Sequence, residues 1–222
     1  MYQGKYVFTQ VMEIVTRSEF TKCVDRYNGD KNLVHFKCWQ QFLCMAFGQL
    51  AYRESIRDIF TCLNAHKKKA YHFGLKNLAD ATTLTCANKN RDWRLWQDLA
   101  MHLISVARLL YVEDNDFTLD LDNTVYALDA STIDLCLSVF KWAKFRKQKG
   151  AVKLHTLMDL RGNIPVFIDI TDGKVHDVKI LDKIDFEPGA FYVIDKGYYD
   201  FSRLFRINNA NAFFVIRAKT NL

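Results

Sequence analysis

The sequence predicts an α+β protein in which an all-helical N-terminal domain, residues 1–115, precedes an α/β domain with a mixed sheet, residues 116–222. Two observations lead to this prediction. Apolar residues recur at helical spacing up to about residue 110, whereas the later apolar segments are short and run into turn residues, as strands do. The acidic segment 113–116 separates the two patterns and marks the expected boundary.

The helical part divides into several segments. Apolar residues recur every three or four positions over 42–50 and again over 56–63. Asp80 is placed to cap a short helix, because an aspartate side chain can accept a hydrogen bond from a free amide of the first turn. Asp92 opens a longer helix. Its expected apolar stripe consists of Trp96, Leu99, Leu103, Val106 and Leu110.

Positive charge is concentrated in this N-terminal part. Residues 1–89 hold 13 Lys and Arg against 7 Asp and Glu, whereas residues 90–222 hold 18 of each kind. Such an excess suits the phosphate backbone of DNA. Two short helices around the basic segment 66–69 could form a helix-turn-helix that brings these residues to DNA: Thr82, Thr85, Asn88, Lys89 and Arg91. An ordinary helical bundle has the same pattern, so both interpretations stay open.

After residue 116 the expected order of elements is strand, hairpin, helix, strand, helix and strand. The expected ranges are 124–132, 151–160, 164–171, 176–184, 190–195, 202–208 and 212–218. A turn at 161–163 joins the two strands of the hairpin. This order is that of an RNase H-like fold, in which the first and fourth strands become neighbours.

Two aspartates follow the apolar residues of those two strands. Asp129 is expected at the exit of the first strand and Asp195 at the end of the fourth. An aspartate at a strand end is often only a turn residue or a helix cap. As a pair at matched positions, however, Asp129 and Asp195 predict a site for a hard divalent cation such as Mg²⁺, because such cations prefer carboxylate ligands. Two such ions can promote phosphoryl transfer on DNA, which makes both aspartates the expected catalytic residues.

A basic cluster between residues 141 and 153 contains no acidic residue. Lys147, Lys149 and Lys153 are candidates for contact with a DNA backbone, although an ordinary solvated loop has the same composition. His155 alternates with Lys153 on one face of the second strand and could touch the same phosphate. The alternative is a histidine that is simply packed within the sheet.

The composition places the chain among globular proteins. Half of its residues are hydrophobic, and no apolar run is long enough to cross a membrane. Six cysteines without CxxC spacing are expected to be reduced core thiols. The N-terminus does not have the layout of a signal peptide, so we expect a cytoplasmic protein without membrane contact.

Several runs carry a family resemblance. The main ones are Tyr126-Ala127-Leu128-Asp129-Ala130-Ser131-Thr132 and Asp195-Lys196-Gly197-Tyr198. They resemble the two catalytic blocks of DDE transposases of the insertion-sequence-four type. Residues 149–157, 170–174 and His176-Asp177 fit the same family, and residues 1–90 look like the helical domain of unassigned function that often precedes its catalytic domain.

The resemblance implies a bacterial, nucleoid-associated enzyme that cuts and rejoins double-stranded DNA at the terminal inverted repeats of a transposon. It implies Mg²⁺ or Mn²⁺ as cofactor, Asp129 and Asp195 as the first two acids of the catalytic triad, and leaves self-association into a homo-oligomer open. The family's third acid, a late glutamate with a Tyr, Arg, Glu, Lys signature, has no counterpart here. We therefore expect an incomplete RNase H-like domain in a C-terminally truncated chain, with little or no strand transfer by residues 1–222 alone.

Two alternatives to an active transposase follow. The chain could be a catalytically inactive DNA-binding or regulatory remnant of a transposase, in which case DNA binding would need neither a metal ion nor Asp129. It could also be a metal-dependent nuclease that shares only the fold.

Overall fold

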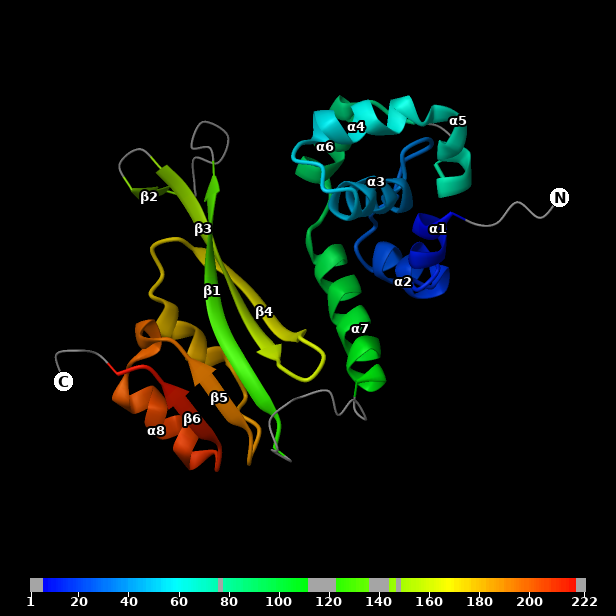
Figure 1. Ribbon diagram of the computed structural model, residues 1–222. Helices are drawn as coiled ribbons and strands as arrows, with labels where there is room; N and C mark the ends of the chain where they lie inside the picture. Colours follow the sequence, from blue (N-terminus) through cyan, green and yellow to red (C-terminus); the bar gives the residue numbers. More distant parts are fainter. Residues whose placement is uncertain (1–5, 76–77, 112–122, 136–143, 147–148, 219–222) are drawn as a thin grey trace. The chain divides into compact units, whose positions relative to one another are not determined.

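The computed structural model describes residues 6–75, 78–111, 123–135, 144–146 and 149–218 (Figure 1). The chain forms two compact units, Met1–Leu103 and Ile104–Leu222, which are described separately below. The acidic segment 113–116, where the sequence places the domain boundary, lies outside the described residues.

The first unit consists of helices. Their bounds are α1 Val7–Met12, α2 Arg17–Arg26, α3 Cys38–Leu50, α4 Ile56–Ala65, α5 Lys67–Ala70, the 3₁₀ helix η1 Tyr71–Phe73, α6 Ala81–Asn90 and α7 Arg94–Leu110, whose last turns belong to the second unit. Two of the expected caps are present: Asp80 Oδ1 accepts a hydrogen bond from the Thr83 amide at 2.7 Å, and Asp92 Oδ1 accepts one from the Arg94 amide at 3.0 Å. The helical character that the sequence predicts for this region is confirmed.

Two apolar clusters hold these helices together, and α3 contributes to both. In one cluster Leu43 of α3 packs with Leu63 of α4 and Leu84 of α6, all fully buried. Helices α3 and α4 approach closely at Gly48, where a Cβ atom would lie 2.5 Å from Ile59 Cδ1. The other cluster joins α2, α3 and α7.

The apolar stripe expected on α7 is only partly correct. Leu99 is buried as predicted, but so is Leu95, which the stripe did not include. Val106 and Leu110 are exposed to 42% and 76%. The predicted stripe is therefore wrong for Val106 and Leu110. Apolar residues continue at three-four spacing along α7, but the apolar cluster with α2 and α3 contacts only the first turns of the helix.

The second unit is built around a sheet. Its elements are β1 Val125–Leu135, β2 Lys144–Arg146, β3 Lys149–Asp159, β4 Ile164–Asp172, η2 Asp177–Lys183, β5 Phe191–Ile194, η3 Lys196–Tyr198, α8 Phe201–Asn209 and β6 Phe213–Ile216. The expected turn between β3 and β4 is present, with Gly162 and Asn163 at φ 72° and 53°. The helix predicted over 176–184 is a 3₁₀ helix.

The strands lie in the order β4-β3-β1-β5-β6, and the short β2 pairs with the start of β3. β1, β3 and β4 are antiparallel neighbours, whereas β5 and β6 run parallel to β1 (Figure 1). First and fourth major strands are therefore side by side in a mixed sheet, which confirms the α+β class and the RNase H-like order of strands.

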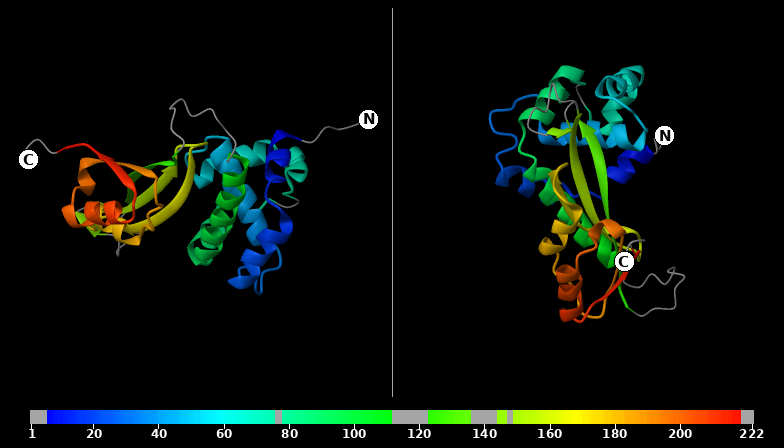
Figure 2. Two further views of the ribbon diagram at one scale, coloured as in Figure 1. Left: turned by 90° about the horizontal axis from the view of Figure 1, so that it is seen from below. Right: turned by 90° about the vertical axis from the view of Figure 1, so that its left-hand side faces the viewer.

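Helical segments cover one face of this sheet. Tyr126 and Leu128 of β1 and Tyr192 and Ile194 of β5 form a core with η2 and α8, which lie on the same side of the strands (Figure 2). Successive residues of a strand point to opposite faces, so Asp129 and Asp195 point away from this core.

Candidate active site

The parallel pairing of β1 with β5 brings Asp129 and Asp195 together. Leu128 lies opposite Ile194 in the last pair of this ladder, and each aspartate is the next residue of its strand. The pairing joins residues 66 positions apart, which is the separation of the two aspartates. Since neighbouring strands lie about 4.8 Å apart, the two carboxylates leave the sheet next to one another.

One expectation about Asp129 is wrong. The sequence places it at the exit of the first strand, but β1 continues to Leu135, and Asp129 lies near the middle of it. What ends at Asp129 is the pairing with β5, because β5 stops at Ile194. Residues 130–135 of β1 continue to pair with β3 alone. The Asp129 carboxylate therefore lies at the point where β5 ends and β1 continues, and it is exposed to solvent.

A positive charge already contacts Asp195. Ile216 of β6 lies opposite Ile194, so Arg217 follows Asp195 in register. The Nη2 atom of Arg217 lies 3.0 Å from Asp195 Oδ1. Both side chains are at least half exposed, a setting in which such pairs contribute about 0–1 kcal/mol. Arg217 is thus a weak counterion that a divalent cation could displace.

The donor atoms of this edge suit a hard divalent cation. Two exposed carboxylates from adjacent strands supply oxygen ligands, and Mg²⁺ is commonly held by one or two carboxylates while it keeps several water molecules. In the part of the chain that the structure describes, no three Asp, Glu, His or Cys side chains come close enough to hold one ion together. Asp129 and Asp195 could therefore bind a cation with water completing its shell.

Lys153 of β3, which the sequence predicts to contact a DNA phosphate, instead contacts other residues of the protein. Its Nζ lies 2.9 Å from Asp177 Oδ1 and donates a hydrogen bond to the Val175 carbonyl at 2.8 Å. The sequence analysis assigned no individual role to Asp177. Its proximity to Lys153 depends on how η2 packs against the sheet, and in the sequence only its place beside His176 in a family-like segment pointed to it.

His155 is fully buried in β3. Its Nε2 lies 2.8 Å from Thr171 Oγ1, and burial lowers the pKa of the imidazole below its usual value. A neutral, enclosed ring has no access to a DNA backbone, so this position matches the alternative of a histidine packed within the sheet.

The other two basic candidates cannot be placed. Lys147 lies outside the described residues, and Lys149 begins β3 but its side chain is not among those described.

The helical unit contains the residues that a helix-turn-helix would present. Thr82, Thr85 and Lys89 on α6 are exposed. The side chains of Asn88 and Arg91 form hydrogen bonds within the unit. The buried Gln41 donates a hydrogen bond to Asn88 Oδ1 at 2.6 Å and accepts one from Arg91. DNA reading by α6 stays a prediction that depends mainly on Thr82, Thr85 and Lys89, since the side chain of the exposed Asn88 is bonded to Gln41.

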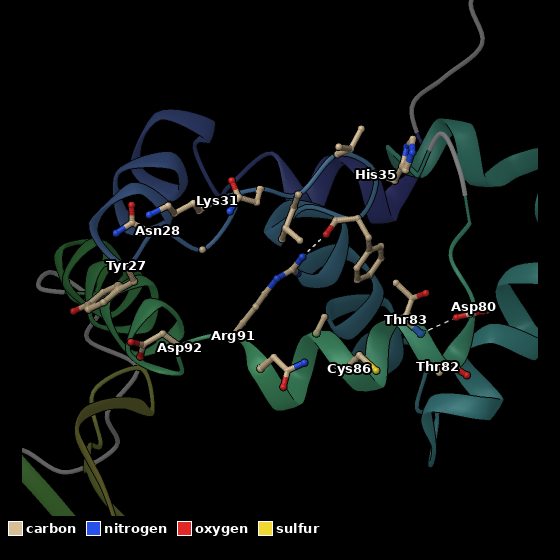
Figure 3. Close-up of a pocket in the computed structure, with 17 residues that line it drawn as sticks. Tyr27, Asn28, Lys31, His35, Asp80, Thr82, Thr83, Cys86, Arg91 and Asp92 are labelled. Atoms are coloured by element: carbon tan, nitrogen blue, oxygen red, sulfur yellow. Dashed lines mark hydrogen bonds between the residues drawn. The ribbon is translucent and has the colours of Figure 1, made fainter.

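A pocket of about 810 Å³ lies beside α6, between this helix and the segment 27–36 (Figure 3). Arg91 forms part of its wall and reaches across to the Phe36 carbonyl, to which it donates a hydrogen bond. Lys31 and His35 line the same pocket. The Arg91 contacts thus tie the loop to the end of α6.

An exposed basic run lies elsewhere in the helical unit. Lys67, Lys68 and Lys69 form α5, and the exposed Tyr71 follows. Among the described residues, no carboxylate lies within 4 Å of these three ammonium groups, unlike Lys22, which is 2.7 Å from Glu19. Unpaired lysines beside an aromatic ring suit a nucleic-acid backbone.

Comparison with known proteins agrees with this arrangement. Residues 120–222 match the family model of the transposase DDE domain, and residues 3–76 match that of a domain of unknown function (DUF4372). "Putative transposase y4zB" of Sinorhizobium fredii is 40% identical to this chain over 81 residues. The aligned part is 36% of this chain and 23% of that protein. These findings confirm the resemblance to DDE transposases of the insertion-sequence-four type. Within the described residues, no helix has the length and hydropathy needed to cross a bilayer.

Proposed function

We infer from the match to the transposase DDE domain that this chain acts in DNA transposition, with the second unit as a metal-dependent catalytic domain for DNA cleavage and strand transfer. The observation that carries the proposal is the parallel pairing of β1 and β5, after which Asp129 and Asp195 follow side by side. When bound there, Mg²⁺ or Mn²⁺ neutralises charge at the scissile phosphate and activates a water or a 3′-hydroxyl for attack.

The residues of the chain have distinct parts in this proposal. Asp129 and Asp195 would hold the cation. Arg217, which pairs with Asp195 in the structure, would contact a phosphate of the DNA through its guanidinium group once Asp195 serves as a ligand. The first unit, with the net positive charge of residues 1–89, holds double-stranded DNA at the transposon ends.

A second candidate function is DNA binding without catalysis. It is favoured by the positive charge of residues 1–89 and by the finding that, among the described residues, no three His, Cys, Asp or Glu side chains form a group that could hold a metal ion. In this case the chain would act as a regulatory module that occupies transposon ends.

One experiment separates the two functions. The purified chain and the variant Asp129→Ala are incubated with DNA that carries the transposon ends, with Mg²⁺ or with EDTA, and both binding and cleavage are measured. Cleavage that requires Mg²⁺ and disappears in Asp129→Ala supports the catalytic function. Binding that survives both EDTA and Asp129→Ala, without any cleavage, supports the binding module and contradicts catalysis by this chain.

The basic run 67–69 is expected to contribute to DNA affinity through phosphate contacts. Replacing Lys67, Lys68 and Lys69 together by glutamine should weaken binding of any DNA sequence. It should also reduce the slope of log affinity against log salt by about 2–3, since each lost phosphate contact removes about 0.9. Fluorescence anisotropy at several salt concentrations measures both quantities.

The matched control is Lys22→Gln, because the Lys22 charge is already offset by Glu19. Its salt slope should equal that of the unchanged chain. An unchanged slope in the triple variant would show that α5 does not face the DNA.

A further inference from the structure

The pocket beside α6 has no part in the function proposed above. Its volume of about 810 Å³ is in the range of sites that hold a small organic ligand. Lys31 and His35 line it from the loop, and Cys86 lines it from α6 (Figure 3). All residues around it belong to the first unit, so a ligand could bind there independently of the two aspartates of the sheet.

The positive charges of this pocket have no counterion within the described part of the protein. The Arg91 guanidinium group is half-buried, and it donates hydrogen bonds to two neutral acceptors, Gln41 Oε1 and the Phe36 carbonyl. Among the described residues, no carboxylate oxygen lies within 4.0 Å of the charged nitrogens of Arg91 or of the exposed Lys31. A charge that is partly removed from water is unfavourable unless an opposite charge compensates it.

The two acids that line the pocket already have other partners. Asp80 Oδ1 accepts the hydrogen bond from the Thr83 amide at 2.7 Å. Asp92 Oδ2 lies 2.6 Å from Nη2 of Arg94, which does not line the pocket. An anionic ligand would therefore supply the missing counterion through charge-assisted hydrogen bonds.

The pocket also offers flat apolar surface and side-chain amides. The rings of Tyr27 and Phe36 line it, and the guanidinium carbon of Arg91 lies 5.5 Å from the centroid of the Phe36 ring. Asn28 and Asn32 line it as well, and no described residue forms a hydrogen bond with their side-chain amides. Bases stack on aromatic rings, and amides form hydrogen bonds with base edges. A nucleotide combines these features with the negative charge of a phosphate.

We propose that the pocket holds one unpaired nucleotide of a DNA strand. Arg91 and Lys31 contact its phosphate. The base stacks on Phe36 and forms hydrogen bonds with Asn28 and Asn32. A base inside a duplex is paired and stacked, so a nucleotide enters the pocket only where the strand is unpaired, as at a DNA end. This inference rests on the proposed function for DNA as the ligand, but it needs neither a cation nor the two aspartates of the sheet.

The test compares two labelled DNA probes bound by the full chain in the presence of EDTA. One probe is a blunt duplex, and the other is the same duplex with one unpaired adenine nucleotide at one end. Fluorescence anisotropy gives both affinities. The unchanged chain should bind the second probe about fivefold or more tightly, as expected for the stacking of one base on an aromatic side chain.

Two variants of the pocket and two matched controls locate this preference. Lys31→Gln and Phe36→Leu should each reduce the ratio of the two affinities to less than about twofold. Lys37→Gln changes another exposed lysine of the same region, and Phe47→Leu changes another partly buried ring of the apolar cluster to which Phe36 belongs. Neither control residue lines the pocket, so both variants should keep the full ratio. The thermal unfolding of each variant is measured alongside.

Cys86 gives a second readout that needs no substitution. It lines the pocket and is exposed, whereas the other described cysteines are buried or half-buried. The probe with the unpaired nucleotide, at saturation, should slow the alkylation of Cys86 by N-ethylmaleimide about fivefold more than the blunt duplex does. Mass spectrometry of the peptides measures the rate.

The outcomes separate this inference from DNA binding by the chain. If both probes bind equally, or if the preference survives in Lys31→Gln and Phe36→Leu, the nucleotide pocket is overturned and DNA binding stands. If neither probe binds, both are overturned. Free deoxyadenosine monophosphate that binds as tightly as the second probe would overturn DNA as the ligand of the pocket. A preference lost in the two pocket variants alone, with Cys86 protected, supports the inference.

Discussion

Replacing Asp129 by asparagine is expected to lower the affinity of the chain for Mn²⁺ by on the order of 100-fold or more, because it removes one of two charged ligands from a site that has no third in direct reach among the described residues. The side-chain shape is kept and Asp129 is exposed, so the free energy of unfolding should hardly change. Calorimetric titration with Mn²⁺ measures the first quantity and urea denaturation the second. Asp195→Asn should have the same effects on the Mn²⁺ affinity and on the free energy of unfolding.

Asp134→Asn is the matched control for this prediction. Asp134 is an exposed acid of the same strand, five residues beyond Asp129 and past the end of the pairing with β5. Its replacement should leave the Mn²⁺ affinity unchanged. Equal losses at Asp129 and Asp134 would mean that Mn²⁺ responds only to net charge and that no site exists at the end of β5.

The largest expected effect on stability is at Ile194, the residue before Asp195. Ile194 is 4% exposed and packs in the core beneath η2 and α8. Ile194→Ala should lower the free energy of unfolding by about 2–5 kcal/mol, because it leaves a cavity in a packed core. Urea denaturation followed by circular dichroism measures the change.

The control is on the neighbouring residue of the same strand. Val193 points to the opposite face of the sheet and is 39% exposed. Val193→Ala should cost at most about 1 kcal/mol, since little apolar surface is lost from a buried position. Similar costs at both positions would contradict the assignment of a covered and an open face to this part of the sheet.

Most of the strands could be predicted from the sequence because their apolar residues are bounded by turn residues, whereas the short β2 and the extension of β1 to Leu135 were not expected. The turn at Gly162 and Asn163 and the strand before Asp195 are examples. The strand order then follows from the limited ways to connect such elements, and it is confirmed. The roles of Asp129 and Asp195 as ligands stay predictions.

The surroundings of these aspartates could not be predicted in the same way. Whether Lys153 meets a phosphate or Asp177 depends on the path of the chain through 173–177, which has no periodic pattern. The burial of His155 depends on what covers its face of the sheet, and the alternation within β3 is compatible with either outcome. The exposed end of α7 shows the same limit, because periodicity shows which residues share a face but not whether a core lies against it.

The most direct test of the central claim is a crystal structure of the chain grown with MnCl₂, in which anomalous scattering locates Mn²⁺. We expect a Mn²⁺ ion in contact with carboxylate oxygens of both Asp129 and Asp195, with Arg217 turned away from Asp195. An ordered sheet without Mn²⁺ at these carboxylates, and with Arg217 still paired to Asp195 at saturating Mn²⁺, would contradict it.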